Sequence, residues 1–223
     1  MSESWDLRSW TDAAVDVLTL ARAGRAGSER TGPLVVAVDG RSAGGKSTVA
    51  GSLATAVEDA TVVHTDDVAW NHGFFDWVGL LVGGVLEPLA RGEVVAYRPP
   101  VWVENQREGA IEVPAGVGVV VIEGVGASRR ELEPWLDAAI WVQSDADAAR
   151  RRGIERDITL GRDRPEAVAF WDEWMAQEVP FLAADRPWER ADLVVCGTPT
   201  QPVDGVLISR GRATPGRPAP QTS

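Results

Sequence analysis

Short apolar runs along the chain predict a set of buried strands. Residues 34–38 form a continuous apolar run between Pro33 and Gly40. Runs of this kind, without polar alternation, are typical of strands covered on both faces. Similar runs predict further strands at residues 61–65, 118–122, 138–142 and 193–195. Because helical stretches separate several of them, we expect an α/β fold with a doubly wound parallel sheet of about five strands.

Apolar residues at spacings of three and four predict helices that flank this sheet. Residues 5–23 and 49–57 show that spacing. Residues 144–161 begin with Ser144 as a predicted cap and with acids, and they gather arginines toward their end, as the helix dipole favours. Two short apolar runs at 94–97 and 110–113 instead predict a small β-hairpin, because prolines and charged residues lie between them.

Length and local composition divide the chain into one domain and two terminal segments. A chain of 223 residues suffices for one α/β domain, which we expect to span residues 33–208. Residues 1–32 are expected to form an N-terminal helix and a connector rich in glycine and charge. The segment 209–223 has no apolar residue larger than proline, so it is expected to be a disordered tail.

Charge and cysteine content exclude several classes of partner and site. The 33 acidic and 22 basic residues give a formal net charge of −11, which disfavours binding to nucleic acid or anionic lipid. Cys196 is the only cysteine, so neither an internal disulfide nor a cysteine-based metal site is expected. No apolar run approaches the roughly 18 residues of a membrane span, and the start does not resemble a secretory signal. We therefore expect a cytoplasmic protein.

A glycine-rich segment between a predicted strand and a predicted helix carries the clearest chemical signal. Residues 40–47, GRSAGGKS, match the phosphate-binding pattern G-x-x-x-x-G-K-[ST]. Lys46 is also the only lysine in the chain, whereas the other 21 residues with a permanent positive charge are arginines. A lysine at this one position indicates that the site requires a compact cation. The alternative is a glycine-rich turn without a ligand. The residues expected to hold the phosphates of ATP are Gly40, Ser42, Ala43, Gly44, Gly45, Lys46, Ser47 and Thr48.

Missing motifs narrow the class of nucleotide-binding protein. With no lysine after position 46, the chain cannot form the N-K-x-D element by which GTPases select guanine. The L-S-G-G-Q signature of transporter ATPases is also absent. A small-molecule kinase that uses ATP and Mg²⁺ is therefore favoured, with the Ser47 hydroxyl as a ligand of Mg²⁺.

A pair of carboxylates follows the second predicted strand. Asp66 and Asp67 should lie at the edge of the sheet that also carries the glycine-rich loop, because parallel strands end at a common edge. A carboxylate there can accept the proton of a hydroxyl group that attacks a phosphoryl group. The two side chains point in different directions, so we expect only one of them to act. A turn or helix cap is the alternative use of these aspartates.

Beyond these features, residues 34–197 resemble the uridine kinase and phosphoribulokinase branch of P-loop kinases, which includes nicotinamide riboside kinases. The branch has an x-D-[SDG]-F-[YF] passage after its second strand, and residues 65–69 match its aspartates but not its aromatic residues. Residues 122–124 are similar to its I-E-G element. The resemblance implies that Asp66 is the catalytic carboxylate, that Lys46 takes part in catalysis and that Glu123 lies beside Mg²⁺.

The same resemblance covers the acceptor site and the lid. Residues 74–77 are similar to the family's A-F-D-x-D stretch, which binds ribose hydroxyls, and residues 86–97 to the helix that leads into its base-contacting hairpin. The resemblance implies an acceptor site formed by Phe75, Asp76, Tyr97 and Trp102. Residues 152–157 and 161–163 resemble the family's arginine-rich lid, which implies that Arg156 and Arg162 close over ATP. A solvated basic helix end is the alternative.

The chain also departs from the family. Tyr97 is followed by Arg98 where uridine kinases carry an aspartate, and Gly153 stands where the lid has an arginine. Aromatic side chains near the predicted acceptor site can stack on a base, namely those of Trp70, Trp77 and Trp102. Helical spacing predicts core positions instead for Trp171, Trp174 and Met175.

These features lead to one functional hypothesis and two rivals. We expect a kinase that transfers the γ-phosphoryl group of ATP to the primary hydroxyl of a nucleoside, with uridine or cytidine first, or of a related small metabolite. One rival is a kinase for nicotinamide riboside or pantothenate. The other is a nucleotide-binding regulator without transfer activity. The sequence leaves open whether copies of the chain form a homo-oligomer.

Overall fold

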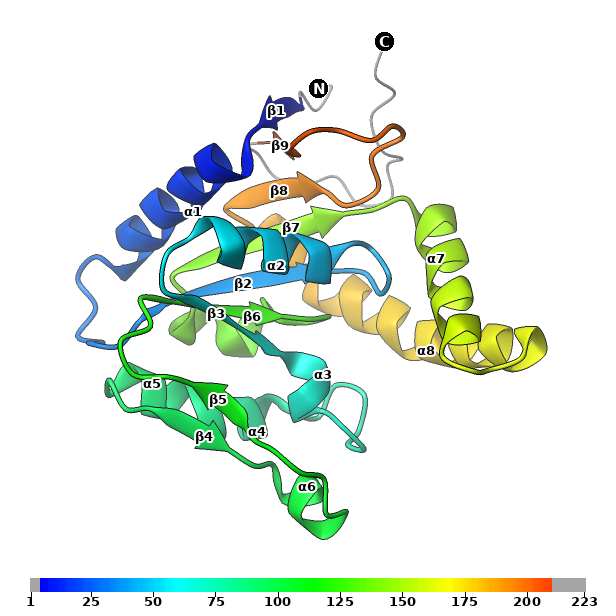
Figure 1. The fold of residues 1–223 in the computed structure, drawn as a ribbon, viewed down its shortest axis with the longest axis horizontal. Helices are drawn as coiled ribbons and strands as arrows, with labels where there is room; N and C mark the ends of the chain where they lie inside the picture. Colours follow the sequence, from blue (N-terminus) through cyan, green and yellow to red (C-terminus); the bar gives the residue numbers. More distant parts are fainter. Residues whose placement is uncertain (1–4, 210–223) are drawn as a thin grey trace.

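A computed structural model describes residues 5–209 of the chain. Within this range seven strands form one sheet in the order β1-β9-β8-β7-β2-β6-β3 (Figure 1). Five consecutive strands are parallel: β2 (Leu34–Gly40), β3 (Ala60–His64), β6 (Val119–Glu123), β7 (Ala138–Gln143) and β8 (Leu193–Cys196). The predicted α/β fold with a parallel sheet is confirmed.

The expected number of about five strands is corrected to seven. β9 (Val206–Ser209) pairs antiparallel with β8, and β1 (Asp6–Arg8) pairs antiparallel with β9. β1 falls inside the segment predicted to be wholly helical, and the helix begins only after the Ser9 cap, whose hydroxyl accepts a hydrogen bond from the Asp12 amide. The pairing joins the two ends of the described chain, so no local pattern could predict it.

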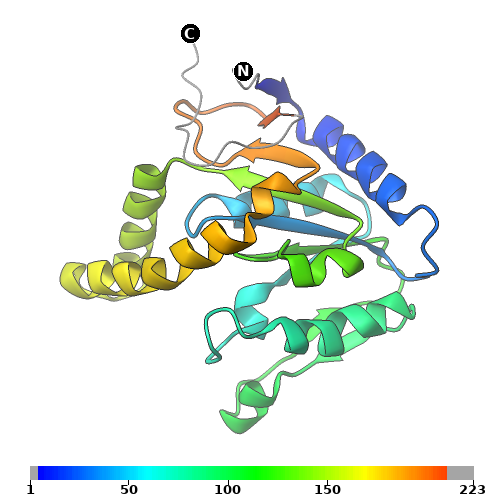
Figure 2. The same ribbon diagram turned by 180° about the vertical axis from the view of Figure 1, so that it is seen from behind.

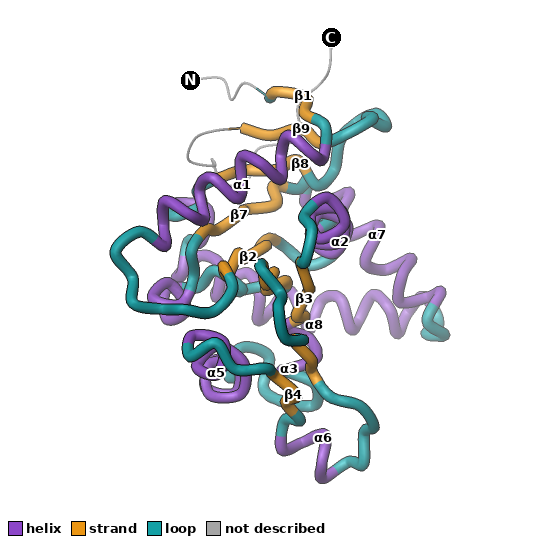
Figure 3. The backbone as a smooth tube through the Cα atoms, turned by 60° about the vertical axis from the view of Figure 1, so that its left-hand side comes forward, coloured by secondary structure: helices purple, strands orange, loops and turns teal. Residues whose placement is uncertain are grey.

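Two helices cover one face of the sheet. α1 (Trp10–Arg25) and α2 (Lys46–Ala56) pack on that face, with α1 lying over the side toward β9 (Figures 1 and 3). Along β2, Val36 and Val38 face these helices, whereas Val35 and Ala37 enter the core on the other side. Both faces of the strand are therefore buried, which explains its unbroken apolar run.

The opposite face is covered by a helical segment and by part of α8 (Figure 2). The helical segment runs through α4 (Val78–Leu81), the π-helical turn η1 (Val82–Leu86) and α5 (Glu87–Ala90). Beyond it, β4 (Val95–Tyr97) and β5 (Ile111–Val113) pair antiparallel, which confirms the predicted hairpin. The short helix α6 (Pro100–Glu104) lies between these two strands in the chain.

Two long helices stand at the carboxyl ends of the strands (Figure 1). α7 (Ala146–Thr159) is capped by the Asp145 side chain, which accepts a hydrogen bond from the Ala148 amide, so the predicted cap at Ser144 is one residue too early. α8 (Arg164–Asp185) begins with a capping box between Asp163 and Glu166. The remaining short helices are α3 (Thr65–Val68), η2 (Arg130–Trp135) and η3 (Pro187–Glu189).

Of the helices in residues 5–209, none combines the length and the apolar character that a membrane crossing requires. The predicted disordered tail lies outside the described residues except for Ser209, which is the last residue of β9.

Candidate active site

A cavity of about 1050 Å³ opens at the carboxyl ends of the parallel strands. Its walls come from the loop before α2, from α3, from α7 and α8, and from the segment that follows β8. A site at this edge agrees with the general rule that ligands of open α/β sheets bind outside the carboxyl ends of the strands. The cavity brings together segments that are more than 100 residues apart in sequence.

The glycine-rich loop forms the floor of this cavity. Ala43 and Gly45 have φ angles of 55° and 100°, which turn the backbone into a concave loop directly before α2. A side chain at position 45 would place its Cβ 2.8 Å from the Gly197 carbonyl oxygen, so the position requires glycine. Residues 42–48 line the cavity, whereas Gly40 starts the turn behind it. A concave run of amides at a helix N-terminus fits the phosphates of a nucleotide.

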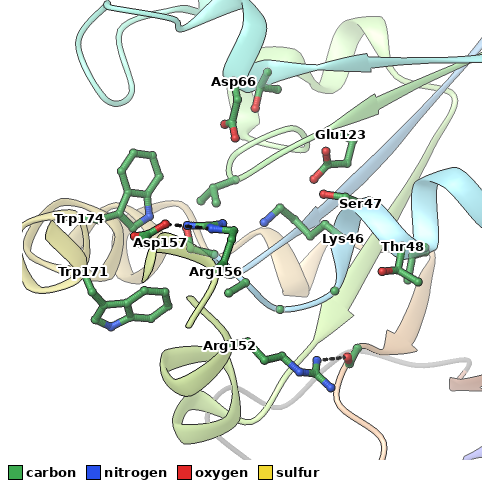
Figure 4. A pocket seen from close by; sticks show the side chains of 18 of the residues that line it. Lys46, Ser47, Thr48, Asp66, Glu123, Arg152, Arg156, Asp157, Trp171 and Trp174 are labelled. Carbon is green, nitrogen blue, oxygen red and sulfur yellow. Dashed lines mark hydrogen bonds and ion pairs between the residues drawn. The ribbon is translucent and has the colours of Figure 1, made fainter. Parts of the chain in front are cut away.

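Lys46 points from the loop into the same space (Figure 4). The residue is only 7% exposed, and its Nζ donates a hydrogen bond to the Arg41 carbonyl oxygen at 2.9 Å. An ammonium group has three protons, so this bond occupies one and leaves the others for a ligand. The near-complete burial of Lys46 agrees with the compact cation that was predicted at this position.

Asp66 lies in the first turn of α3, directly after β3, and lines the cavity. Figure 4 places its carboxylate on the opposite side of the cavity from the glycine-rich loop, facing the space in front of Lys46. Burial within the cavity walls raises the pKa of Asp66, and the nearby Lys46 ammonium partly offsets this effect. A carboxylate with a raised pKa is the better proton acceptor, provided that the pH keeps it ionised.

Glu123 ends β6 on the same wall and is 6% exposed. Its Oε2 lies 2.6 Å from His64 Nδ1, and this hydrogen bond raises the pKa of the imidazole. Ser47 also lines the cavity, and Figure 4 shows both side chains beside the Lys46 ammonium. A hydroxyl and a carboxylate next to a phosphate loop are oxygen donors of the kind that Mg²⁺ accepts, so these residues fit the predicted metal site.

Asp39 is a buried aspartate, not predicted from the sequence, that connects two loops beside the cavity. Asp39, at the end of β2, accepts hydrogen bonds from the amides of Gly40, Gly126 and Ser128. Full burial raises its pKa, and the amide donors oppose that shift. The carboxylate thereby joins the start of the glycine-rich loop to the turn after Glu123. Its only signal in the sequence is a polar residue that closes an apolar run just before a glycine.

A second buried carboxylate joins the glycine-rich loop to α8. Glu178 is fully buried and accepts hydrogen bonds from the Ser42 amide at 3.1 Å and from Trp174 Nε1 at 2.7 Å. It was missed because an acid within a helix is usually a solvated residue. The spacing of four between Trp174 and Glu178, which places them on one helix face, was the available signal.

The arginines of the predicted lid occupy different places. Arg156 lines the cavity, and its Nε donates a hydrogen bond to Asp157 Oδ1 at 3.1 Å. Arg152 also lines the cavity and donates to the Gly197 carbonyl oxygen. Arg162 does not line the cavity; its guanidinium lies over the Phe170 ring, 4.1 Å from the centroid. The other oxygen of Asp157, Oδ2, is buried without a hydrogen-bond partner among the described residues.

The structure does not bring the predicted acceptor residues to the cavity. Trp102 is buried; its Nε1 donates to the Asp67 carbonyl oxygen, and the Arg107 guanidinium lies 3.6 Å from the centroid of its ring system. Its stacking face is therefore already occupied. The remaining predicted residues also lie elsewhere: Tyr97 packs against Gly84, Phe75 stacks on Phe181 at 4.1 Å, and Asp76 is exposed.

Other aromatic side chains line the cavity in their place. Trp171, predicted as a core residue, is buried against Gly153 and also contributes to the wall. Trp174, predicted likewise, is half-buried, and the edge contact between its ring and that of Phe74 has a centroid distance of 5.0 Å. Trp70 and Trp77, two of the three tryptophans predicted near the acceptor site, also line the cavity, as do Trp10 and Phe170.

Comparisons with solved structures show that the chain shares its fold with proteins named as kinases. A "putative fructose transport system kinase" from Silicibacter sp. TM1040 superposes with a TM-score of 0.57 at 21% identity, covering 81% of this chain and 93% of that one. D-glycerate 3-kinase from Cryptococcus neoformans gives 0.56 at 15% identity, with 74% and 86% covered. The chain therefore has the same overall fold as these two structures.

A "Possible Uridine Kinase" from Bacillus stearothermophilus has 19% identity and a TM-score of 0.42, with 82% of this chain and 98% of that one covered. No family model matches the chain, and no curated protein matches its sequence.

Proposed function

We propose that this protein is an ATP-dependent kinase that transfers the γ-phosphoryl group to a hydroxyl group of a small molecule, with a nucleoside such as uridine or cytidine as the first candidate. One observation carries the proposal. The carboxylate of Asp66 faces, across one cavity, the glycine-rich loop and the ammonium of Lys46. That is the arrangement required to hold a triphosphate and to take a proton from an attacking hydroxyl.

In the proposed reaction each residue has a separate task. The amides of residues 43–46 and the Lys46 ammonium bind and orient the phosphates. Asp66 accepts the proton of the acceptor hydroxyl as its oxygen bonds to the γ-phosphorus atom, while the bond between that atom and the oxygen of ADP breaks. Arg156 offsets negative charge that spreads over the transferred group. Ser47 and Glu123 would hold Mg²⁺, which supplies further charge neutralisation when it is bound.

The neighbouring solved structures support the kinase class through the shared fold, while their substrates differ. One is named for fructose transport and another for D-glycerate. Their names therefore do not select an acceptor for this chain.

The test is a screen for ADP release with ATP, Mg²⁺ and a panel of nucleosides, vitamins and sugars. We expect turnover that depends on one class of acceptor and that Asp66→Asn abolishes. Tight ATP binding without turnover on any acceptor would contradict the proposal and support the rival hypothesis of a nucleotide-binding regulator.

A further inference from the structure

The charged side chains that line the cavity provide no surplus of positive charge. Its permanently cationic lining residues are Lys46, Arg152 and Arg156, which lie on the glycine-rich loop and the predicted lid. If the proposed function holds, the triphosphate pairs with these cations. The carboxylates of Asp66, Glu123 and Asp157 line the cavity as well; Arg156 donates a hydrogen bond to Asp157, and Glu123 lies beside the Lys46 ammonium (Figure 4).

This distribution selects against a negatively charged acceptor. A carboxylate or phosphate on the acceptor would lie near like charges, and the cavity's permanent cations would already be paired with ATP. Like charges at short range in a low-dielectric site repel strongly. An uncharged or positively charged acceptor meets no such penalty.

The aromatic wall supplies the attraction that replaces ionic recognition. Trp174 is held at its edge by Phe74 and at its Nε1 by the buried Glu178 carboxylate. An aromatic ring fixed in this way can bind the flat face of a ligand without a large loss of side-chain freedom. Trp70 and Trp171 extend the wall.

An unsatisfied polar atom lies on the same helical pair. Asp157 Oδ2 is buried and has no hydrogen-bond partner among residues 5–209, although the residue lines the cavity. Figure 4 shows this carboxylate close to the Trp174 ring. A buried acceptor without a donor is costly, and a hydroxyl, amide or ammonium donor on a ligand can offset that cost.

We infer that Trp174 and Asp157 determine acceptor specificity, and that the acceptor is a ring-bearing alcohol without negative charge. Its ring packs against Trp174, and Asp157 accepts a hydrogen bond from it. The hairpin residues Tyr97 and Trp102 take no part, because they lie outside the cavity. The inference rests on the proposed kinase function and deepens it.

Kinetics with a matched acceptor panel test this inference. The panel contains uridine, cytidine and nicotinamide riboside, and the anionic probes are orotidine, D-glycerate and pantothenate. Orotidine differs from uridine by one carboxylate, so this pair isolates the effect of charge. The variants are Trp174→Leu, Trp174→Phe and, as a control, Trp135→Leu, which removes another half-buried tryptophan outside the cavity.

We expect phosphorylation of a neutral or cationic ring alcohol in preference to the anionic probes. Trp174→Leu should raise the KM of that acceptor about tenfold, a stacking-sized effect, and change the KM of ATP by less than about twofold. Trp174→Phe keeps an aromatic ring and should raise the KM of the acceptor less than Trp174→Leu does. This difference distinguishes a loss of ring contact from a general folding defect. Trp135→Leu should leave the KM of the acceptor unchanged.

The possible failures are distinct. If no acceptor is phosphorylated, the proposed function fails, and this inference falls with it. If an acceptor is phosphorylated but an anionic probe has the highest kcat/KM, or Trp174→Leu leaves the KM of the acceptor unchanged, the inference alone is overturned.

Discussion

Carboxylates at the two ends of the parallel sheet have opposite surroundings. At the amino end, Asp137 is fully buried and pairs with the guanidinium groups of Arg25 and Arg30. It also accepts a hydrogen bond from the Val35 amide at 2.7 Å. Both of its oxygens are therefore satisfied, and the cluster fastens α1 and its connector to the sheet. The Asp137 carboxylate therefore stabilises the fold.

At the carboxyl end, Asp39 and Glu178 are well paired, whereas two carboxylates that line the cavity, Asp66 and Asp157, are not. Burial raises the pKa of Asp66, which means that its surroundings disfavour the charged form. Asp157 Oδ2 has no partner in the described part of the chain. Unpaired charge costs stability, and a fold tolerates that cost where a ligand relieves it. The contrast indicates that one end of the sheet is built for stability and the other for chemistry.

The largest expected effect comes from Asp66→Asn, which removes the proposed proton acceptor without changing the shape of the side chain. We expect kcat/KM for the acceptor to fall about 10³-fold. Because folding disfavours the charged carboxylate, the free energy of unfolding at neutral pH should not decrease. Steady-state kinetics and denaturant unfolding of the same preparation check both points.

The adjacent residue provides a matched control for this prediction. Asp67 has the same chemistry, but its Oδ1 accepts a hydrogen bond from Arg107, and the residue does not line the cavity. Asp67→Asn should retain activity to within a few-fold. If the two variants lose activity equally, Asp66 has no special role. The conclusion that the carboxyl end of the sheet holds a catalytic carboxylate would then be wrong.

Asp137→Asn should have the opposite effects to Asp66→Asn, namely a loss of stability without a loss of activity. The substitution leaves Arg25 and Arg30 without their full countercharge, at side-chain exposures of 16% and 17%. Breaking a buried ion pair costs about 3 kcal/mol, so we expect the free energy of unfolding to fall by that amount. Activity per folded molecule should stay near normal at low temperature. An unchanged denaturation midpoint would show that this cluster contributes nothing to stability.

Lys46→Arg tests the geometry of the loop with the charge retained. The ammonium is nearly buried, and a Cβ at Gly40 would lie 3.3 Å from Lys46 Cγ, so there is little room beside the stem for a planar guanidinium. We expect kcat/KM for ATP to fall about 100-fold, with little change in thermal stability. Activity within a few-fold of normal would contradict the requirement for a compact cation.

The sequence predicted the part of the site that depends on local pattern. The loop of residues 40–47 and the position of Asp66 follow from motifs that occupy one strand end and the turn after it. The five parallel strands were likewise visible as apolar runs. The antiparallel strand β1 contains a single apolar residue, Leu7, and pairs with a strand about 200 residues away. Such an element has no local signal.

The tryptophans that line the cavity could be predicted only in part, for a related reason: Trp70 and Trp77 were expected there, but Trp174 was not. Trp174 and Trp102 are both tryptophans next to helical apolar residues, and nothing in their neighbourhoods in the sequence tells which one faces a cavity. Their roles depend on tertiary partners, because Arg107 covers the face of Trp102 whereas Glu178 holds the edge of Trp174. The resemblance to a family whose hairpin binds the base placed Trp102 at the acceptor site, whereas in the structure Trp102 does not line the cavity.

Glu178→Gln sharpens the comparison at the carboxyl end. Glu178 Oε2 accepts from both the Ser42 amide and the Trp174 indole, and Oε1 lies 3.3 Å from the Ser42 amide nitrogen. A glutamine that keeps its oxygen at the first position places an NH₂ donor against the Ser42 amide at the second, and it also loses the negative charge. We expect the KM values of ATP and of the acceptor each to rise about fivefold, and kcat to change less than about twofold. Glu173→Gln, an exposed site on the same helix, is the control. A change in kcat alone would contradict a positioning role for Glu178.

The smallest effect is a pH dependence in which activity and stability change in opposite directions. The pKa of Asp66 lies above its ordinary value of 3.8 because of burial, so the folded protein binds this proton more tightly than the unfolded chain does. The stability that it contributes is present below the ordinary value and is lost as the pH rises through the raised pKa. As the pH falls through that window, kcat/KM should decrease, while the unfolding free energy of the wild type should rise relative to that of Asp66→Asn. Parallel pH series of kinetics and denaturant unfolding measure the two signs. A decrease of both kcat/KM and the relative unfolding free energy would mean that the ionised Asp66 carboxylate stabilises the fold, as the Asp137 carboxylate does at the other end of the sheet. The proposed division between the two ends would then be wrong.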